Sequence, residues 1–357
     1  IHVVPMLAHT MPDAAADVLR WRHSTLGKAK RRARELGHDG AMFPWRTIDG
    51  DECSAYWPAG TAAVHVSADI AYATARYITA TRDEQFEQDC AVELLVETAR
   101  LWASLGHHDT SGKFRIEGVT GPDEYSAVAD NNLFTNLMAQ QNLRDAAAAC
   151  ERRPDVARRL DVSDEAVAYW RDCANHMTMP YNRDLGVHEQ AENFTRQALW
   201  DFDATPPTDY PLMLRYPYFE LYRKQVVKQA DVTLAMYLRS DAFSAQEKAR
   251  NFEYYEALTV RDSSLSACAQ AVLAAEVGQL QLAYDYLTET AFIDLHNLHD
   301  NVSSGLHIAA LAGTWIVCVA GFGGMRHRGG ELTFAPQLPP MPSRRAFRIL
   351  WRDSCLA

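Results

Sequence analysis

Helical periodicity runs through most of this 357-residue chain and limits what it can fold into. Apolar residues recur every three or four positions in ten segments, a spacing that predicts helices. These segments are Pro12–Leu36, Ala62–Thr81, Glu84–Leu105, Asn132–Cys150, Asp164–Cys173, Val226–Leu238, Ala245–Leu258, Ser264–Val277, Leu280–Phe292 and Ser304–Val319. Strand-like alternation occurs only in Glu331–Ala335 and Arg345–Trp351, on either side of the proline-rich link Pro336–Pro342. The chain is therefore expected to be all-α, with a β segment beginning after Gly329-Gly330.

Long loops rich in aromatic and polar residues separate the predicted helices. They include Met42–Arg46, the segment around Glu124, Pro206–Pro211 and Thr259–Ser264. Extended loops within compact domains often have a function, because binding and catalytic side chains are commonly placed on loops held by a rigid scaffold. An all-helical layout with such loops at one end suggests a helical barrel with a pocket at its mouth.

The composition argues against several classes of protein. With a formal net charge of -11 and a pI of about 5.6, a nucleic-acid binder is unexpected, because such proteins usually present a basic face. The seven cysteines are scattered, with no pair spaced for zinc, and their odd number fits a reducing compartment. Neither a signal peptide nor an apolar run long enough to span a membrane is recognisable. A cytoplasmic protein with no membrane partner is expected.

The segment Gly118–Tyr125, with the sequence GVTGPDEY, places the carboxyl of Glu124 on a turn that contains glycine and proline. Such a turn can aim a side chain into a cavity that a helix face does not reach. Beside an aromatic ring, burial can keep a carboxyl protonated near neutral pH, as a general acid requires. The alternative is an ordinary turn before a helix, in which Asp123 or Asp130 caps free amide groups. Taken alone, these residues favour that alternative.

Two further segments have side chains suited to sugars. The ring of Trp45 could stack on the apolar face of a sugar, although a buried anchor in an acidic loop explains it equally well. Lys228 and Gln229 are expected at the entrance of the helix Val226–Leu238, where they could bond a hydroxylated or anionic ligand. A surface lysine paired with Asp231 or another acid is the commoner arrangement.

The run Arg261-Asp262-Ser263-Ser264 suggests an anion-binding loop, because it directly precedes a predicted helix. Amides at a helix N-terminus attract anions, and Arg261 could hold a phosphate group through two parallel hydrogen bonds. Asp262 or Ser263 could instead cap the helix. The glycine-rich run Gly321–Arg326 follows a helix rather than a strand, so it does not fit a nucleotide-binding loop, and no metal-binding motif is found.

Seven segments, in the same order as in the family, resemble glycoside hydrolase family 65, which contains maltose, trehalose and kojibiose phosphorylases. They are GAMFPW (Gly40–Trp45), GVTGPDEY (Gly118–Tyr125), DNNLFTN (Asp130–Asn136), VKQADV (Val227–Val232), SSLS (Ser263–Ser266), DNVSSGLHIAALAGTW (Asp300–Trp315) and GFGGMR (Gly321–Arg326). Because these segments span nearly the whole chain, the resemblance reverses the preference for an ordinary turn at Glu124.

The resemblance implies an (α/α)6 barrel followed by the beginning of a C-terminal β domain. The barrel is expected over residues 1–326, without its first part, and the β domain over 327–357. The family's N-terminal β-sandwich and its Trp-Asp sugar-binding motif are not found in this sequence. A fragment is therefore expected, and the family suggests a homodimer.

The resemblance also implies a role for individual side chains. Glu124 matches the family's proton donor, and Lys228 and Gln229 match its sugar-contacting pair, with Trp45 expected to help fix the glucose ring. The implied reaction is inverting phosphorolysis of an α-linked glucose disaccharide, trehalose or maltose, to β-glucose 1-phosphate and glucose. Glu124 would protonate the departing oxygen, and inorganic phosphate is the co-substrate, with no cofactor or metal expected.

The phosphate is expected to bind Arg261, Ser263 and Ser264. Phosphorylases of the family commonly have histidine shortly before the two serines, where this chain has Arg261. That difference leaves open whether phosphate or water attacks, and the alternative is an inverting α-glucoside hydrolase in which an acid near Arg261, such as Asp262, serves as the base. The missing Trp-Asp motif leaves a second alternative, a non-catalytic sugar-binding remnant.

Overall fold

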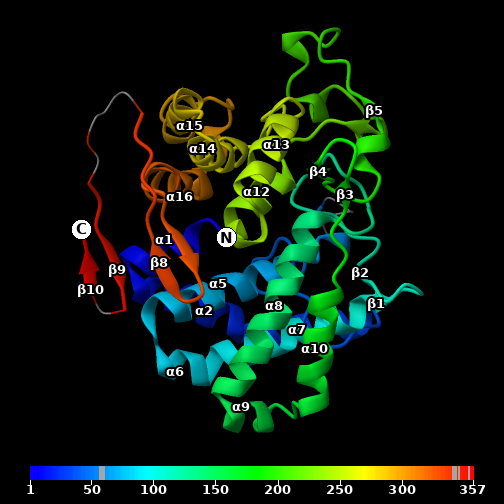
Figure 1. The fold of residues 1–357 in the computed structure, drawn as a ribbon, viewed down its shortest axis with the longest axis vertical. Coiled ribbons are helices and arrows are strands. Elements are labelled where there is room, and N and C mark those ends of the chain that lie inside the picture. Colours follow the sequence, from blue (N-terminus) through cyan, green and yellow to red (C-terminus); the bar gives the residue numbers. More distant parts are fainter. Residues whose placement is uncertain (56–60, 340–343, 345, 353) are drawn as a thin grey trace.

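A ring of six helices forms the centre of the molecule in the computed structural model (Figure 1). The structure describes residues 1–55, 61–339, 344, 346–352 and 354–357. Within that part of the chain each ring helix packs against the next, and the last packs against the first. The ring helices are α1 (Val3–Thr10), α5 (His65–Thr81), α8 (Leu133–Arg152), α12 (Asp231–Leu238), α14 (Ser266–Glu276) and α16 (Ile308–Ile316).

A second layer of helices surrounds the ring. It contains α2 (Pro12–Ser24), α3 (Leu26–Glu35), α7 (Val92–Leu105), α10 (Asp164–His176), α13 (Ala245–Glu256) and α15 (Leu280–Phe292). Ring and outer helices alternate along most of the chain, and all of these outer helices except α3 pack on one or two neighbouring ring helices. This is the arrangement of an (α/α)6 barrel and confirms the predicted fold class. No helix in the described residues is both long and apolar enough to cross a membrane.

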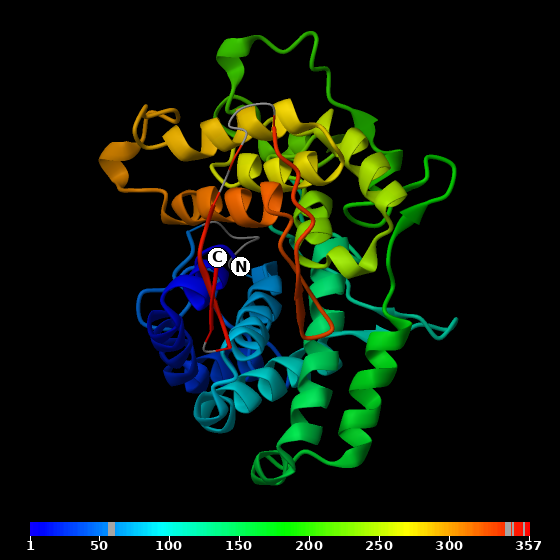
Figure 2. The same cartoon turned by 60° about the vertical axis from the view of Figure 1, so that its left-hand side comes forward.

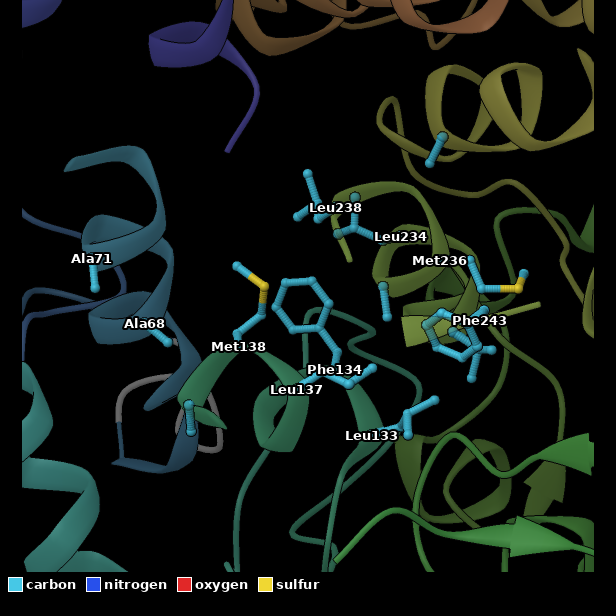
Figure 3. Packing of buried hydrophobic residues seen from close by; sticks show 14 of the residues in the cluster. Ala68, Ala71, Leu133, Phe134, Leu137, Met138, Leu234, Met236, Leu238 and Phe243 are labelled. Atoms are coloured by element: carbon cyan, nitrogen blue, oxygen red, sulfur yellow. The ribbon is translucent and has the colours of Figure 1, made fainter. Parts of the chain in front are cut away.

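Apolar side chains of the ring helices fill the interior of the barrel. Figure 3 shows part of this core, where side chains of α5, α8 and α12 gather, among them Phe134, Met138 and Leu234. Helix α14 is buried along its length apart from Glu276, and its many alanines allow neighbouring helices to approach closely. The ring is therefore held mainly by hydrophobic burial, the largest favourable contribution to folding.

The N-terminal ends of the ring helices converge at one end of the barrel. Residues at or just before the start of α1, α5, α12 and α14 line a single cavity of about 190 Å³, among them His2, His65, Asp231 and Ser266. The start of α8 lies at the same end, because the side chain of Asn132 bonds Asp231. Loops that precede the ring helices are thereby brought together.

The remaining elements are short. They are α6 (Glu84–Phe86), α9 (Pro154–Arg159), α11 (Tyr218–Leu221), the π-helical segments Glu87–Ala91 and Val317–Phe322, and the two-residue strands β1 (His107–His108), β2 (Phe114–Arg115), β3 (Tyr181–Asn182), β4 (Val187–His188), β5 (Ala198–Leu199) and β6 (Lys224–Gln225). At the end of the chain β7 (Arg326–Arg328) pairs with β8 (Glu331–Thr333), and β9 (Ile349–Trp351) pairs with β10 (Ser354–Leu356). Figure 2 shows these hairpins in orange and red, and β9 packs against α1 and α5.

Two helix predictions are corrected by the structure. The predicted helix Pro12–Leu36 is broken at Thr25, whose hydroxyl bonds the carbonyl of Arg22 at 2.8 Å. The predicted helix Val226–Leu238 begins only at Asp231, because the backbone of Val227 is bonded to Leu258 and Val260 in an extended arrangement. Lys228 and Gln229 therefore lie on an extended segment before a helix.

Two further differences concern the ends of the chain. Helix α1, which closes the ring, was not expected from the periodicity. The β structure begins before Gly329-Gly330, because these two glycines, at φ 55° and 81°, form the turn between β7 and β8. Part of the predicted strand Arg345–Trp351 lies outside the described residues, and its final residues form β9.

Candidate active site

The predicted acid, Glu124, lies on a loop whose two ends are joined by backbone hydrogen bonds. The N–H groups of Val119 and Ala129 each donate to the other's carbonyl, at 2.9 and 2.8 Å. Thr120 donates its N–H to the carbonyl of Ala62 at 2.9 Å, which ties the loop to the segment leading into α5. Within this loop a turn carries Glu124, whose side chain is 19% exposed. The loop holds the carboxyl at the end of the barrel where the ring helices begin.

Asp123, the neighbour of Glu124, is buried and holds two loops together. Its Oδ1 accepts the N–H of Tyr125 at 3.2 Å and the N–H of Lys228 at 2.9 Å. Its Oδ2 accepts the side-chain amide of Gln190 at 2.8 Å. Because one carboxylate bonds both loops, Asp123 sets the position of Glu124 relative to Lys228.

A second buried carboxylate, that of Asp231, bonds the backbone of Asp123. Asp231 Oδ1 accepts the N–H of Asp123 at 2.8 Å, and its Oδ2 accepts the side-chain amide of Asn132 at 2.8 Å. Burial raises the pKa of both carboxyls, and the nearby charge of Asp123 raises the pKa of Asp231 further. Asn132 also caps α8 by accepting the N–H of Thr135 at 2.9 Å, so the expected cap at Asp123 or Asp130 is corrected.

Glu124 and Lys228 form an ion pair across the two loops. The Nζ of Lys228 donates to Glu124 Oε2, and only 14% of the lysine side chain is exposed. Beside this pair, Gln229 Nε2 donates to the carbonyl of Pro122 at 2.7 Å, and Gln229 Oε1 accepts the hydroxyl of Ser263 at 2.6 Å. Four predicted site residues thus come together: Glu124, Lys228, Gln229 and Ser263. The acid that pairs with Lys228 is therefore Glu124 and not Asp231.

Asp262 joins the loop that carries Glu124 to the loop that contains Pro206–Pro211. Its Oδ2 accepts the hydroxyl of Tyr125 at 2.5 Å and the N–H of Leu212 at 2.8 Å, and the Tyr125 oxygen accepts the N–H of Met213 at 2.9 Å. Burial raises the pKa of Asp262, and the hydrogen bond from Tyr125 opposes that rise. Asp262 therefore acts as a clamp between loops.

The side chain of Arg261 contacts outer helices, unlike those of Asp262 and Ser263, which contact Tyr125 and Gln229. Its guanidinium lies 3.8 Å from the Glu256 carboxylate and 3.9 Å from that of Glu289, and it donates to the Tyr286 hydroxyl at 3.1 Å. These residues belong to the outer helices α13 and α15. Ser264 is half-buried in the turn before α14. The phosphate-binding roles of Arg261 and Ser264 stay predictions.

Trp45 lies on a loop tied to its own acidic segment. Its backbone N–H donates to Glu52 Oε2 at 2.7 Å, and the guanidinium of Arg46 lies over its ring at 4.4 Å. Trp45 is only partly buried, so these contacts decide neither for the buried anchor nor for sugar stacking. The sugar-binding role of Trp45 stays a prediction.

His299 is a residue near the site that the sequence analysis missed. It lies in the loop between α15 and α16, close enough to Asp262 and Lys228 for their charges to affect it. Burial lowers the pKa of His299, the charges of His307 and Lys228 act in the same direction, and Asp262 opposes them. Its place just before the segment DNVSSGLHIAALAGTW is the only sequence signal that pointed to this loop.

The loop that carries Glu124 packs closely against Asp231 and Asn132 at Gly121, and this close contact gives a first prediction. A Cβ at this position would lie 2.1 Å from Asp231 Oδ2 and 2.5 Å from Asn132 Nδ2. We expect Gly121→Ala to lower the free energy of unfolding by about 3 kcal/mol, because the clash disrupts a buried hydrogen-bond network. Urea unfolding measures the loss. Gly27→Ala is the control: nothing lies within 4 Å of its Cβ in α3, so it should be neutral or slightly stabilising, and equal losses would contradict the prediction.

Sequence comparison identifies the family to which this arrangement belongs. The family model of the glycosyl hydrolase family 65 central catalytic domain matches residues 1–316, and that of the family's C-terminal domain matches residues 325–357. The chain belongs to glycosyl hydrolase family 65. The resemblance seen in its seven motifs is thereby confirmed, and Glu124 lies within the part that matches the catalytic domain.

Individual relatives of this family 65 chain support the assignment. An uncharacterised glycosyl hydrolase of Mycobacterium tuberculosis is 57% identical over 98% of this chain, and the match covers 44% of that protein. An alpha,alpha-trehalose phosphorylase of Geobacillus stearothermophilus is 46% identical over 98% of the chain, and a maltose phosphorylase of Bacillus subtilis is 36% identical over 99%. Each of these two matches covers 47% of the relative. The chain thus spans about half the length of these relatives.

Among solved structures, a putative kojibiose phosphorylase from the human microbiome shares the fold. The two superpose with a TM-score of 0.92 at 27% sequence identity, over 99% of this chain and 53% of that one. The barrel built by the ring and outer helices is therefore the fold of a family 65 protein.

Proposed function

We propose that this chain carries the catalytic centre of an inverting phosphorylase that cleaves an α-linked glucose disaccharide, trehalose first and maltose second. The observation that supports the proposal most is the contact between Glu124 and Lys228, with Gln229 and Ser263 beside them. Trehalose is placed first because relatives named as trehalose phosphorylases are 46% and 42% identical to the chain, against 36% for the maltose phosphorylase.

In the proposed reaction Glu124 acts as the general acid. It protonates the glycosidic oxygen as the bond to the anomeric carbon breaks. The Nζ of Lys228 donates a hydrogen bond to the carboxylate of Glu124. If a sugar hydroxyl or a phosphate oxygen accepts the hydrogen bond of Lys228 instead, the carboxyl of Glu124 can carry the proton that it donates. Gln229, whose side chain bonds Pro122 and Ser263, would also bond a hydroxyl of the same sugar.

The phosphate would bind at the end of the barrel where the ring helices begin. Helix N-termini carry partial positive charge and free N–H groups, so their convergence favours an anion. Lys228 adds a full positive charge, and Ser263 adds a hydroxyl close to Gln229. A phosphate oxygen then attacks the anomeric carbon from the face opposite the leaving group, so the reaction needs no second carboxylate to activate water.

A hydrolase is the second candidate, because the 57% identical relative is named a glycosyl hydrolase. Its general base would be Asp262. The Oδ2 of Asp262 already accepts hydrogen bonds from Tyr125 and Leu212, which ties this carboxylate to the protein. That contact supports phosphate rather than water as the attacking group.

The second prediction separates these candidates by their products. With trehalose and inorganic phosphate, we expect equal amounts of glucose and β-glucose 1-phosphate, and almost no turnover when phosphate is left out. Proton NMR identifies the anomer formed, and arsenate in place of phosphate should restore release of glucose. Release of two glucose molecules per trehalose at a rate indifferent to phosphate would instead establish the hydrolase.

A further inference from the structure

Two histidines and an aspartate come together on the outer layer of the barrel, away from the ring. One donor atom from each of His108, Asp172 and His176 lies within 4.8 Å of the others. We propose that these three residues form a binding site for a divalent transition-metal ion, with zinc as the best fit. The proposal does not rest on the catalytic function proposed above.

The distances suit three ligands of one small ion. The Nε2 of His108 lies 3.0 Å from Asp172 Oδ2, and the Nδ1 of His176 lies 3.0 Å from Asp172 Oδ1. Zinc binds nitrogen and carboxylate oxygen at about 2.0–2.2 Å, so ligand atoms of a tetrahedral site are about 3.3 Å apart. Small rotations of the side chains would therefore place an ion between them.

The Nε2 of His108 gives a second observation. It is buried and lies 3.0 Å from the Asp172 carboxylate, but it makes no hydrogen bond to any residue that the structure describes. A metal ion between the two groups would accept the lone pair of this nitrogen and bind the carboxylate as well. His176 Nδ1 bonds the backbone carbonyl of Asp172 at 3.0 Å, a bond it would give up to bind the ion.

The three side chains are held by elements that are joined to each other. Asp172 and His176 are four residues apart on α10, which puts them on the same face of the helix. His108 lies on β1 opposite Phe114 of β2, and Phe114 bridges Met177, the residue after α10. The hairpin and the helix thus keep the ligands close before any metal binds, which lowers the entropy lost on binding.

The ligand set indicates which metals would bind. Two imidazoles and one carboxylate suit zinc and its transition-metal neighbours, whereas magnesium and calcium prefer oxygen ligands. About half of the Asp172 and His176 side chains is exposed, so water can complete the coordination. The ion would fasten the β1–β2 hairpin to α10.

The third prediction is that zinc binds at this site. Isothermal titration calorimetry of the untagged, chelator-treated protein with zinc chloride tests it. We expect one zinc per chain with micromolar or tighter affinity, no binding of magnesium, and a rise of the melting temperature with zinc. His108→Ala and His176→Ala should each weaken binding at least about tenfold. Cobalt(II) should give the intense visible absorption of a tetrahedral site in the wild type and lose it in both variants.

His107→Ala is the matched control, because His107 is exposed, adjacent to His108 and outside the cluster. It should leave the affinity for zinc unchanged. Equal weakening by His107→Ala and His108→Ala would show adventitious binding to surface histidines and overturn the proposal. Unchanged affinity in both His108→Ala and His176→Ala would overturn it as well, and circular dichroism of each variant shows that the fold is retained.

Discussion

Replacing Glu124 with glutamine is expected to lower the turnover of trehalose by about 10²–10⁴-fold, the usual contribution of a general acid. Glutamine keeps the size of the side chain and can still contact Lys228, but it cannot give a proton to the departing oxygen. The loss should therefore appear in kcat, with little change in the binding of glucose measured by calorimetry.

A substrate that needs no protonation sharpens this test. Fluoride leaves without a proton, so Glu124→Gln should keep far more of its activity toward α-glucosyl fluoride and phosphate than toward trehalose. Glu117→Gln is the matched control, since Glu117 is an exposed acid seven positions earlier that pairs with Arg115. Wild-type turnover of trehalose by Glu124→Gln would rule out Glu124 as the acid, and a wild-type protein that binds glucose without turnover would favour the sugar-binding remnant.

Replacing Asp123 with alanine is expected to lower the free energy of unfolding by about 3 kcal/mol and to lower turnover as well. The substitution leaves the N–H groups of Tyr125 and Lys228 and the side-chain amide of Gln190 without an acceptor, and each unpaired buried group costs about 1–3 kcal/mol. Removal of a charge next to Asp231 offsets part of this loss. Turnover falls because the two loops that carry Glu124 and Lys228 lose their common anchor.

Asp123→Asn removes the charge of this residue and keeps only the hydrogen bonds to Oδ1, because its amide nitrogen would face the donor Nε2 of Gln190. Burial raises the pKa of Asp123 above its ordinary value, so the folded protein keeps a proton that the unfolded chain releases. The free energy of unfolding of the wild type therefore falls as the pH rises from its ordinary pKa through the raised one. Asparagine does not titrate, so the penalty of Asp123→Asn should be larger at pH values near 4–5 than above pH 7.

Urea unfolding at both pH values and steady-state kinetics check these expectations. Asp130→Ala serves as the control, because Asp130 is exposed in the same loop and accepts the N–H of Gly118 at 3.0 Å. Its loss should stay near 1 kcal/mol. If Asp123→Ala were no more destabilising than Asp130→Ala, the proposed anchoring of the two loops by Asp123 would be wrong. Partial recovery of turnover in Asp123→Asn relative to Asp123→Ala would mark Asp123 as a positioning residue.

The sequence by itself determined the all-helical fold class and pointed to Glu124 as the predicted acid. Apolar spacing of three and four residues is a local property that any helix must satisfy to bury one face, so it is readable without a structure. The glycine and proline turn in GVTGPDEY made Glu124 a candidate acid, and the resemblance to family 65 then favoured Glu124, Lys228 and Gln229 as site residues. Helical spacing and turn formation depend on residues that are neighbours in the sequence, so these features could be predicted.

Only the tertiary structure decided how these residues are held. Asp123 and Lys228 are 105 positions apart, and Glu124 and Lys228 are 104 positions apart, so no local pattern records their contacts. The same holds for the contact of Arg261 with Glu289 of α15, which lies 28 positions further along the chain. Such contacts arise when the ring of helices closes and brings its loops to one end. The sequence therefore indicated Glu124 as the predicted acid, and the closed barrel determined which residues contact it.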